Sequence, residues 1–465
     1  MPRAINIVLV KLHTNTLVSE SYAESTIYFV YAAYFNALLT YGMETAFFRF
    51  FTKEKEKGKV ISTAFLSLLT TTLLFMTIAF IFSETIAQHL GFTSSLTLRI
   101  LILVTTFDTL LVIPFAYLRV SNRPIKFTFY KILNVAIFAI FNLYFLLYVP
   151  NALAYGNYVP EFIASGFSTQ PLVLYIFISN LLASLITFLL LFPLVFKFKI
   201  SFDKKMLYKM LTYGIPIMIS SLAYVTNENL DKLLLSKYLG KEQMGIYAAC
   251  YKLGVFMSLY IMAFKMGAEP FFFNQADKTN AKQTYARIMN WFIVFGALFM
   301  LIIIGFIDQF AHLLLGKPEY FQALEIVPVI LLANLFLGIY YNLSVWFKLT
   351  DKTRYGMYFS ILGALITVGL NIIYIPKIGY MASAWATLIT YLFIALLSYF
   401  YGKKHYHIPY PLKSIFLTLI VTIAGSYLSF IYFRGNYMVS TAIIVLFTGM
   451  IIWTQKSEIK QIWKT

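Results

Sequence analysis

The chain has 465 residues and a mean hydropathy of +0.76; 60% of its residues are hydrophobic and only 12% are charged. A water-soluble fold of this length could neither bury so much apolar surface nor cover it with polar side chains, so the composition excludes a soluble protein and indicates an integral membrane protein. The net charge of +18 does not indicate nucleic acid, because the basic residues gather in alternate loops between apolar stretches.

Apolar stretches of about 18 to 25 residues, enough to cross a hydrocarbon core of about 30 Å, recur from end to end. We predict thirteen membrane helices, over residues 22–51, 60–82, 96–120, 127–149, 172–196, 206–238, 244–273, 288–307, 323–347, 355–375, 380–401, 415–433 and 438–453. The loops after the first stretch and after every second one that follows, together with the helix ends that border them, hold 26 of the 37 Lys and Arg residues. This pattern predicts that these loops and the C-terminus face the cytoplasm.

Because successive loops lie on alternate sides of the membrane, the loop before the first predicted stretch must lie outside the cytoplasm. Residues 1–17 are therefore expected to cross the membrane as well. Their apolar part, 4–10, would rise only about 10 Å as a helix, too short to span. We therefore expect the second half of a first helix that begins before this sequence, and fourteen helices in all. The predicted domains are an N-terminal lobe at 1–200 with helices one to six, a second lobe at 201–404 with helices seven to twelve, and a part at 405–465 with the last two helices and a cytoplasmic tail.

The sequence contains an internal repeat: two segments match later segments of the same chain when the sequence is shifted by nearly the same number of residues. A shift of 225 residues places Tyr22 on Tyr247 and Gly42 on Gly267, and a shift of 229 gives a second match that starts in the loop after the stretch 96–120. Six predicted helices separate the copies, an even number, so both copies run in the same direction. The halves are therefore predicted to be parallel repeats, an arrangement of transporters whose substrate site lies between two lobes near the middle of the membrane.

Ionisable residues inside a membrane helix are costly, so each is a candidate for function. Lys252 and Lys265, in the stretch 244–273, and Arg3, in the incomplete first helix, are predicted to line a basic cavity for an anionic substrate. The alternatives are that the Lys252 side chain extends to the membrane surface and that Lys265 pairs with Glu269, four residues further on.

Three residues are predicted to act at the cytoplasmic side. Glu44 and Glu269 occupy equivalent positions in the two repeats, and each has a cation close in sequence, which for Glu44 is Arg49. We interpret Glu44, Arg49 and Glu269 as a gate that closes the cavity toward the cytoplasm, with ion coupling as the alternative.

Asp108 lies at the centre of the stretch 96–120 and has no basic residue three or four positions away. A buried carboxylate without a fixed partner could carry a proton, so we predict that Asp108 couples transport to H⁺ or Na⁺; the alternative is a salt bridge to another helix. The single cysteine, Cys250, excludes an intramolecular disulfide and a thiolate metal cluster, and we expect no metal and no cofactor beyond a coupling ion.

Several short motifs carry a resemblance to a known family. The motifs Tyr213-Gly214-Ile215-Pro216, Asp231-Lys232, Gly245-Ile246-Tyr247 and Tyr251-Lys252 resemble the seventh and eighth helices of bacterial polysaccharide flippases of the Wzx type, in the multidrug/oligosaccharidyl-lipid/polysaccharide exporter (MOP) superfamily. The stretch 39–50, Leu-Thr-Tyr-Gly-Met-Glu-Thr-Ala-Phe-Phe-Arg-Phe, resembles their second helix. The resemblance covers essentially the whole chain and assigns a structural role to Pro216, Asp231, Lys232, Gly245 and Tyr247. The family more usually has Asp-Arg where this chain has Asp231-Lys232.

The resemblance implies an all-α polytopic membrane protein in which two parallel six-helix repeats form a V-shaped transporter, with two further C-terminal helices. It implies a transporter and not an enzyme, one that moves an undecaprenyl-diphosphate-linked oligosaccharide across the inner membrane by alternating access, for O-antigen, capsule or exopolysaccharide synthesis. The partners it implies are this lipid, membrane lipids and the polysaccharide polymerase machinery. The alternatives are a lipid II flippase of peptidoglycan synthesis, a cation-coupled multidrug exporter, and a membrane-embedded glycosyltransferase or polymerase.

Overall fold

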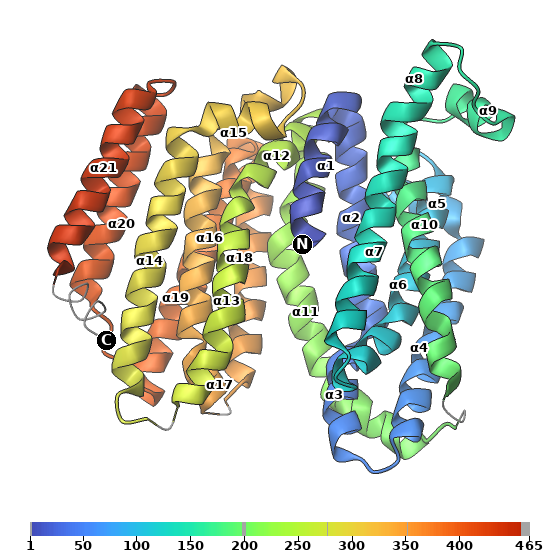
Figure 1. Cartoon of the computed structure of the whole chain (residues 1–465), viewed down its shortest axis with the longest axis horizontal. Coiled ribbons are helices and arrows are strands. Elements are labelled where there is room, and N and C mark those ends of the chain that lie inside the picture. Colours follow the sequence, from blue (N-terminus) through green and yellow to red (C-terminus); the bar gives the residue numbers. More distant parts are fainter. Residues whose placement is uncertain (1, 198–200, 277, 351, 457–465) are drawn as a thin grey trace. The chain divides into compact units, whose positions relative to one another are not determined.

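The protein is described by a computed structural model over residues 2–197, 201–276, 278–350 and 352–456, and the regular elements in these ranges are all helices (Figure 1). Twelve helical stretches in them are long and apolar enough to cross a membrane. They are Lys57–Ile81, Ser95–Val120, Pro124–Ala154, Leu174–Leu194, Lys204–Leu239, Lys241–Gln275, Ala281–Gly305, Ile326–Leu349, Arg354–Ile378, Met381–His405, Leu412–Tyr432 and Tyr437–Thr454. Each coincides with one predicted stretch, so the prediction of an all-α polytopic membrane protein is confirmed.

The first of two compact units runs from Met1 to Gly245. Its elements are α1 (Pro2–Thr16), α2 (Ser19–Thr40), α3 (Met43–Lys53), α4 (Lys57–Ile81), α5 (Ser83–Leu90), α6 (Ser95–Val120), α7 (Pro124–Leu143), the π-helix η1 (Tyr144–Tyr148), α8 (Val149–Ala154), α9 (Glu161–Thr169), α10 (Leu174–Leu191), the 3₁₀-helix η2 (Phe192–Lys197), α11 (Lys204–Leu239) and the start of α12 (Lys241–Gly254). Helix α6 is apolar around most of its circumference and packs against α2, α4, α7 and α10. It is therefore the central helix of this unit.

The second unit runs from Ile246 to Thr465. Its elements are the rest of α12, then α13 (Phe256–Gln275), α14 (Ala281–Gly305), α15 (Ile307–Leu314), the 3₁₀-helix η3 (Pro318–Ala323), α16 (Ile326–Leu343), α17 (Val345–Leu349), α18 (Arg354–Ile378), α19 (Met381–His405), α20 (Leu412–Tyr427), the π-helix η4 (Leu428–Tyr432) and α21 (Tyr437–Thr454). Helix α19 packs against both α16 and α18, and α14 packs against α16 and α20.

The predicted stretch 22–51 is wrong as a single span, because the structure divides it into α2 and α3. The backbone turns at Tyr41 (φ 33°) and Gly42 (φ 73°), both in the left-handed region. Glycine is required here for a second reason: a Cβ atom on Gly42 would lie 2.2 Å from the carbonyl oxygen of Gly214 in α11, and one on Gly214 would lie 2.7 Å from the carbonyl oxygen of Tyr41. Two of the family-like motifs therefore meet backbone to backbone.

The boundary between the compact units falls at Gly245 and not at residue 200, where the lobes were predicted to meet. The cause is α11, which packs on α2, α3 and α4 and so belongs to the first unit by its contacts. The lobes derived from the sequence repeat stay a prediction.

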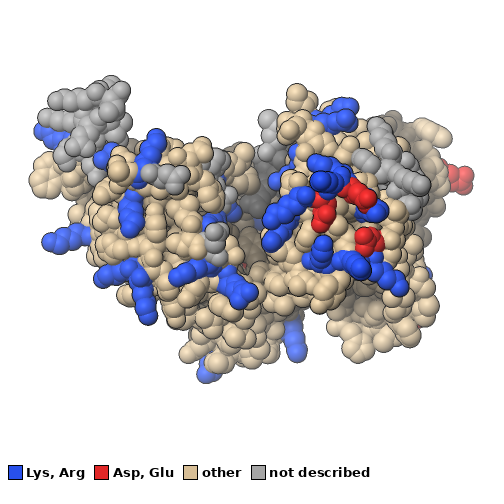
Figure 2. Space-filling model, turned by 90° about the horizontal axis from the view of Figure 1, so that it is seen from below, with Lys and Arg blue, Asp and Glu red and all other residues tan. Residues whose placement is uncertain are grey.

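The basic loops of unit 1 gather at one end of its helices. Arg119, at the end of α6, pairs with Glu44 of α3 at 3.2 Å, and Lys209 of α11 pairs with Glu54 at 3.8 Å. Figure 2 views the molecule from this side, where the Lys and Arg side chains of unit 1 gather around its Asp and Glu side chains. The three loops that were predicted to share the cytoplasmic side thus share one end of unit 1.

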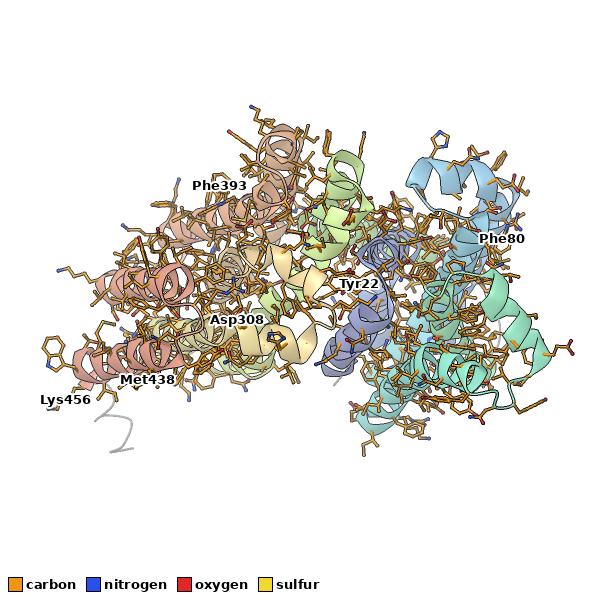
Figure 3. All side chains as sticks on the ribbon, turned by 90° about the horizontal axis from the view of Figure 1, so that it is seen from above. Tyr22, Phe80, Asp308, Phe393, Met438 and Lys456 are labelled. Atoms are coloured by element: carbon orange, nitrogen blue, oxygen red, sulfur yellow. The ribbon has the colours of Figure 1, made fainter. Side chains whose placement is uncertain are left out.

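The last two membrane helices, α20 and α21, lie outside the predicted repeat and pack on α14 through a cluster that includes Leu301, Phe447 and Ile451. Near the start of α21, Arg434 donates to Oδ1 of Asp308 with two nitrogens, Nη2 at 2.6 Å and Nε at 3.0 Å. Asp308 lies on α15 and is labelled in Figure 3. A two-point contact of this kind fixes orientation as well as distance. The two helices are thus attached to unit 2 by an apolar face and by a charged link at one end.

Candidate functional site

Unit 1 contains a polar cavity of about 470 Å³ among its membrane helices. It is lined by Asn36, Ala37, Thr40, Gly42, Glu44, Thr45, Asp108, Leu111, Val112, Phe115, Phe127, Lys131, Asn134, Ile217 and Ser221. These residues come from the α2–α3 turn, the central α6, α7 and α11. More than half of the lining residues carry a polar group or are glycine, which is unusual inside an apolar helix bundle and marks the cavity as a candidate site.

Asp108 is placed in this cavity by the central position of α6. Its Oδ1 atom accepts a hydrogen bond of 2.7 Å from the Ser184 hydroxyl of α10. Among the described residues Asp108 forms no ion pair, and the Lys131 ammonium is the nearby charge that acts on it. The salt bridge that was the alternative reading is therefore absent from this part of the structure, and the assignment of ion coupling to Asp108 stays a prediction.

Lys131 is a functional candidate that the sequence reasoning missed, because it was counted only among the basic residues of a cytoplasmic loop. It lies in the second turn of α7 and lines the cavity, with its Nζ atom 4.0 Å from the centroid of the Phe115 ring. A signal was present in the sequence: Asn134 follows three residues later and Asn142 eleven residues later, which gives α7 a polar face. Asn134 donates to the Ala183 carbonyl and the Thr187 hydroxyl of α10, both at 3.1 Å.

The predicted gate residue Glu44 also lines this cavity, but its partner is Arg119 and not Arg49. The Arg49 guanidinium instead lies over the Tyr213 ring, 4.4 Å from its centroid. Residues five apart on α3 point in different directions, whereas Arg119 reaches Glu44 from α6. The Glu269 side chain lies outside the described residues, so the predicted gate remains untested.

The predicted cavity lysines do not form one cluster. Lys265 of α13 lies with its Nζ atom 4.6 Å from the Tyr341 centroid and lines a small cavity of unit 2, about 20 Å³, together with Lys348 of α17. Lys252 of α12 is exposed and is not part of that lining. The Arg3 side chain lies outside the described residues.

The adjacent residues Asp231 and Lys232, to which the resemblance assigns a structural role, contact each other. Both are buried, and Lys232 Nζ donates to Asp231 Oδ1 at 2.9 Å and to the Glu228 carbonyl at 2.6 Å. Side chains on a helix point toward its N-terminus. The long lysine stem therefore runs back one turn and passes its neighbour.

The other motif residues have packing roles. Gly245 approaches the backbone of Ser19 so closely that a Cβ atom would lie 2.0 Å from its carbonyl oxygen, and Tyr247 is fully buried. Pro216 lies inside the continuous helix α11. Within the described ranges, no three His, Cys, Asp or Glu side chains come together in a way that could hold a metal ion.

Comparisons with known proteins bear on the whole chain. The family model described as polysaccharide biosynthesis protein matches residues 3–275, and the MatE model matches residues 216–373. No curated protein sequence matches the chain.

Solved structures of membrane transporters share the fold. The lipid II flippase MurJ in an inward-closed conformation has a TM-score of 0.75 at 16% identity, over 97% of each chain. An inward-facing multidrug resistance transporter of the MATE family has a TM-score of 0.67 at 12% identity, over 87% of this chain and 94% of that one. A MOP superfamily transporter from Pyrococcus furiosus has a TM-score of 0.56 at 12% identity, over 87% and 95%. Because the first family model spans more than half of the sequence, the chain belongs to the polysaccharide biosynthesis protein family, and it shares its fold with membrane transporters of known structure.

Proposed function

We propose that the chain is a flippase that carries an undecaprenyl-diphosphate-linked oligosaccharide from the cytoplasmic to the outer leaflet of a bacterial inner membrane by alternating access, for synthesis of a surface polysaccharide. The observation that carries the proposal is the match to the polysaccharide biosynthesis family over residues 3–275. The prenyl tail of such a substrate can stay in lipid, but its diphosphate and sugar hydroxyls cannot enter hydrocarbon without polar partners. A flippase therefore needs polar groups inside its helix bundle.

The unit 1 cavity offers such groups. Its volume of about 470 Å³ falls within the range of about 300–1,000 Å³ that is common for small-molecule sites. Asn36, Thr40 and Ser221 present amide and hydroxyl groups of the kind that bind sugar hydroxyls, and Lys131 presents a positive charge. Lys265 adds a cation in unit 2. These groups support a substrate that is both anionic and rich in hydroxyls.

A lipid II flippase is the second candidate, favoured by the likeness to MurJ over 97% of both chains. At 16% identity this likeness carries the fold and not the substrate. A cation-coupled drug exporter is less well supported, because an acidic cavity is expected there, whereas the cavity of unit 1 contains Lys131 and its Glu44 is already paired with a cation. The MatE match also covers a smaller part of the chain, residues 216–373.

Three further parts of the proposal follow from the same reasoning. Asp108 would couple transport to H⁺ or Na⁺, as a carboxylate inside the bundle without an ion pair among the described residues. The basic loops support an orientation with these loops and the C-terminus in the cytoplasm. The polysaccharide polymerase machinery would receive the flipped substrate on the outer side.

The test is to deplete the protein in its native host and to measure undecaprenyl-linked lipids by mass spectrometry, with leaflet location determined by a membrane-impermeant sugar oxidant. We expect a diphosphate-linked oligosaccharide to build up on the cytoplasmic side and to disappear when the wild-type gene is restored. Build-up of lipid II would assign the chain to peptidoglycan synthesis instead. An unchanged lipid profile together with altered drug sensitivity would refute the flippase and favour an exporter.

A further inference from the structure

We propose that Lys131 and Asp108 form one binding site in unit 1 for a phosphate group, in which an anion on Lys131 and a proton on Asp108 bind together. The natural occupant is then the diphosphate of the lipid-linked substrate. Only that last assignment rests on the proposed function, because the site itself can be tested with a small diphosphate.

The net charge of the cavity lining depends on Lys131 and Asp108. Three ionisable side chains line it, Glu44, Asp108 and Lys131. Glu44 is paired with Arg119 at 3.2 Å, whereas neither Asp108 nor Lys131 forms an ion pair within the described part of the chain. With Asp108 ionised, the two remaining charges cancel. With Asp108 protonated, the cavity keeps the full positive charge of Lys131 and attracts an anion.

Lys131 is held in place without being neutralised. Its Nζ atom lies 4.0 Å from the centroid of the Phe115 ring, an attraction that leaves the charge on the ammonium. Phe115 follows Asp108 by seven residues on α6, which is two turns or about 10 Å along the same face. The ammonium is thus near the carboxylate but separated from it, with space in the cavity for a ligand beside it.

The surroundings of Asp108 contain few other charges that could take over its role. Helix α10 carries no charged residue, and α4 carries only Lys57 and Lys59, both in its first turn. The groups that do face Asp108 or Lys131 are the hydroxyl of Tyr28 from α2, the hydroxyl of Ser184 from α10, and the paired Glu44 and Arg119 from α3 and α6. A change in proton binding inside the cavity is therefore expected to belong to Asp108.

Linked binding of this kind is reciprocal: if the proton favours the anion, the anion favours the proton by the same factor. Couplings between sites commonly amount to about 5- to 150-fold. Because the Lys131 charge acts on Asp108 across the cavity, we expect a phosphate group to bind at least about tenfold more tightly when Asp108 is protonated. Binding at a pH where Asp108 is ionised should then take up close to one proton from the solution.

The experiment measures binding of P1,P2-dimethyl diphosphate, which stays a dianion over the whole pH range used, by calorimetry to the purified full-length protein in lipid nanodiscs. Titrations at several pH values, each in two buffers with different ionisation enthalpies, give the affinity and the proton uptake. The variants are Lys131→Gln, Asp108→Asn and the control Lys126→Gln. Lys126 carries the same charge on the same helix and, like Lys131, is exposed, but it does not line the cavity. Melting curves establish that each variant is folded.

We expect wild type and Lys126→Gln to bind more tightly as the pH falls and to take up a proton. Asp108→Asn should bind tightly at every pH with no proton uptake, and Lys131→Gln should lose at least tenfold in affinity. Competition by phosphatidylglycerol in the nanodisc, compared with phosphatidylcholine, would support the site and assign it to a lipid headgroup. Equal binding by folded Lys131→Gln and wild type, or the same proton uptake in Asp108→Asn, would overturn the inference. A failed depletion experiment with an intact diphosphate site would refute only the proposed function.

Discussion

The contact between Gly42 and Gly214 should be one of the least replaceable in unit 1. It brings the turn between α2 and α3 against α11, so any side chain there separates the two motifs. In Gly42→Ala the new Cβ would lie 2.2 Å from the Gly214 carbonyl oxygen and 2.8 Å from its carbon, both of them backbone atoms. Backbone atoms cannot rotate away as a flexible side chain can, so the helices themselves have to move.

The loss of stability in Gly42→Ala is the sum of two free-energy costs, one for the left-handed backbone and one for the clash. Alanine in the left-handed region costs about 1–2 kcal/mol, and forcing extra volume into a packed site costs about 1–3 kcal/mol. Gly42→Ala, at φ 73° with the clash, should therefore lose about 2–5 kcal/mol. Gly91→Ala is the matched control, because Gly91 has φ 76° and nothing within 4 Å of a new Cβ. Gly91→Ala should lose only the cost of alanine in the left-handed region, about 1–2 kcal/mol.

Gly214→Ala tests the cost of the clash alone. The backbone of Gly214 is helical, and alanine favours a helix over glycine by about 0.5–1 kcal/mol. Its Cβ would still lie 2.7 Å from the Tyr41 carbonyl oxygen, so the clash should outweigh that gain. The assay is unfolding of the purified variants in mixed micelles by titration with sodium dodecyl sulfate, monitored by circular dichroism. If Gly42→Ala is no less stable than Gly91→Ala, or if Gly214→Ala is more stable than wild type, the close backbone contact is refuted.

Three further predictions concern single charged residues. Asp203 caps α11 by accepting hydrogen bonds from the N–H groups of Met206 and Lys205, and these bonds hold the pKa of the Asp203 carboxyl below its usual range. Its stabilising effect should therefore be present above the unfolded pKa of about 4 and fade as the pH falls through the lower folded value; melting curves of Asp203→Ala should show a loss at pH 7 that shrinks in acid, while Asp203→Asn keeps the cap at pH 7. Lys232→Met leaves the Asp231 carboxylate buried without its ammonium and should cost about 3–5 kcal/mol in the same detergent titration, more than the double variant with Asp231→Asn. Asp108→Asn should abolish the dependence of lipid-linked oligosaccharide transport on a pH gradient in proteoliposomes, with an unchanged melting curve; a gradient dependence equal to that of wild type would remove Asp108 from coupling.

The membrane helices could be predicted because their signal is local: a window of apolar residues is enough to place each of them, and the twelve spans follow the predicted stretches. The break within the stretch 22–51 could not be predicted from the sequence, because the left-handed turn at Tyr41 packs against α11, which is remote in sequence. The equivalent position in the repeat, Gly267, lies inside the helix α13. A glycine in an apolar stretch therefore does not by itself indicate a break.

The candidate site was predictable only in part. Asp108 stood out because the sequence offers no partner within one turn, and the structure adds a serine from α10. Lys131 was hidden by its position at the start of a helix, where a basic residue also serves topology. The pair of Glu44 with Arg119 joins residues 75 positions apart, which no local pattern reveals. The Asp231–Lys232 contact was missed because the rule that neighbours diverge on a helix holds for Cβ atoms and not for the end of a long side chain.

The two breaks in the repeated helix have a consequence for how the duplicated halves can bend. In unit 1 the helix is interrupted at Tyr41 and Gly42, and in unit 2 the interruption lies at Val255, between α12 and α13. In the repeat register Gly42 corresponds to Gly267, so the two joints are displaced by twelve or thirteen residues, about 20 Å of helix. The two breaks therefore fall at different points of the aligned sequence. Each unit has its break at a different place along the helix, so the two units need not bend at equivalent residues.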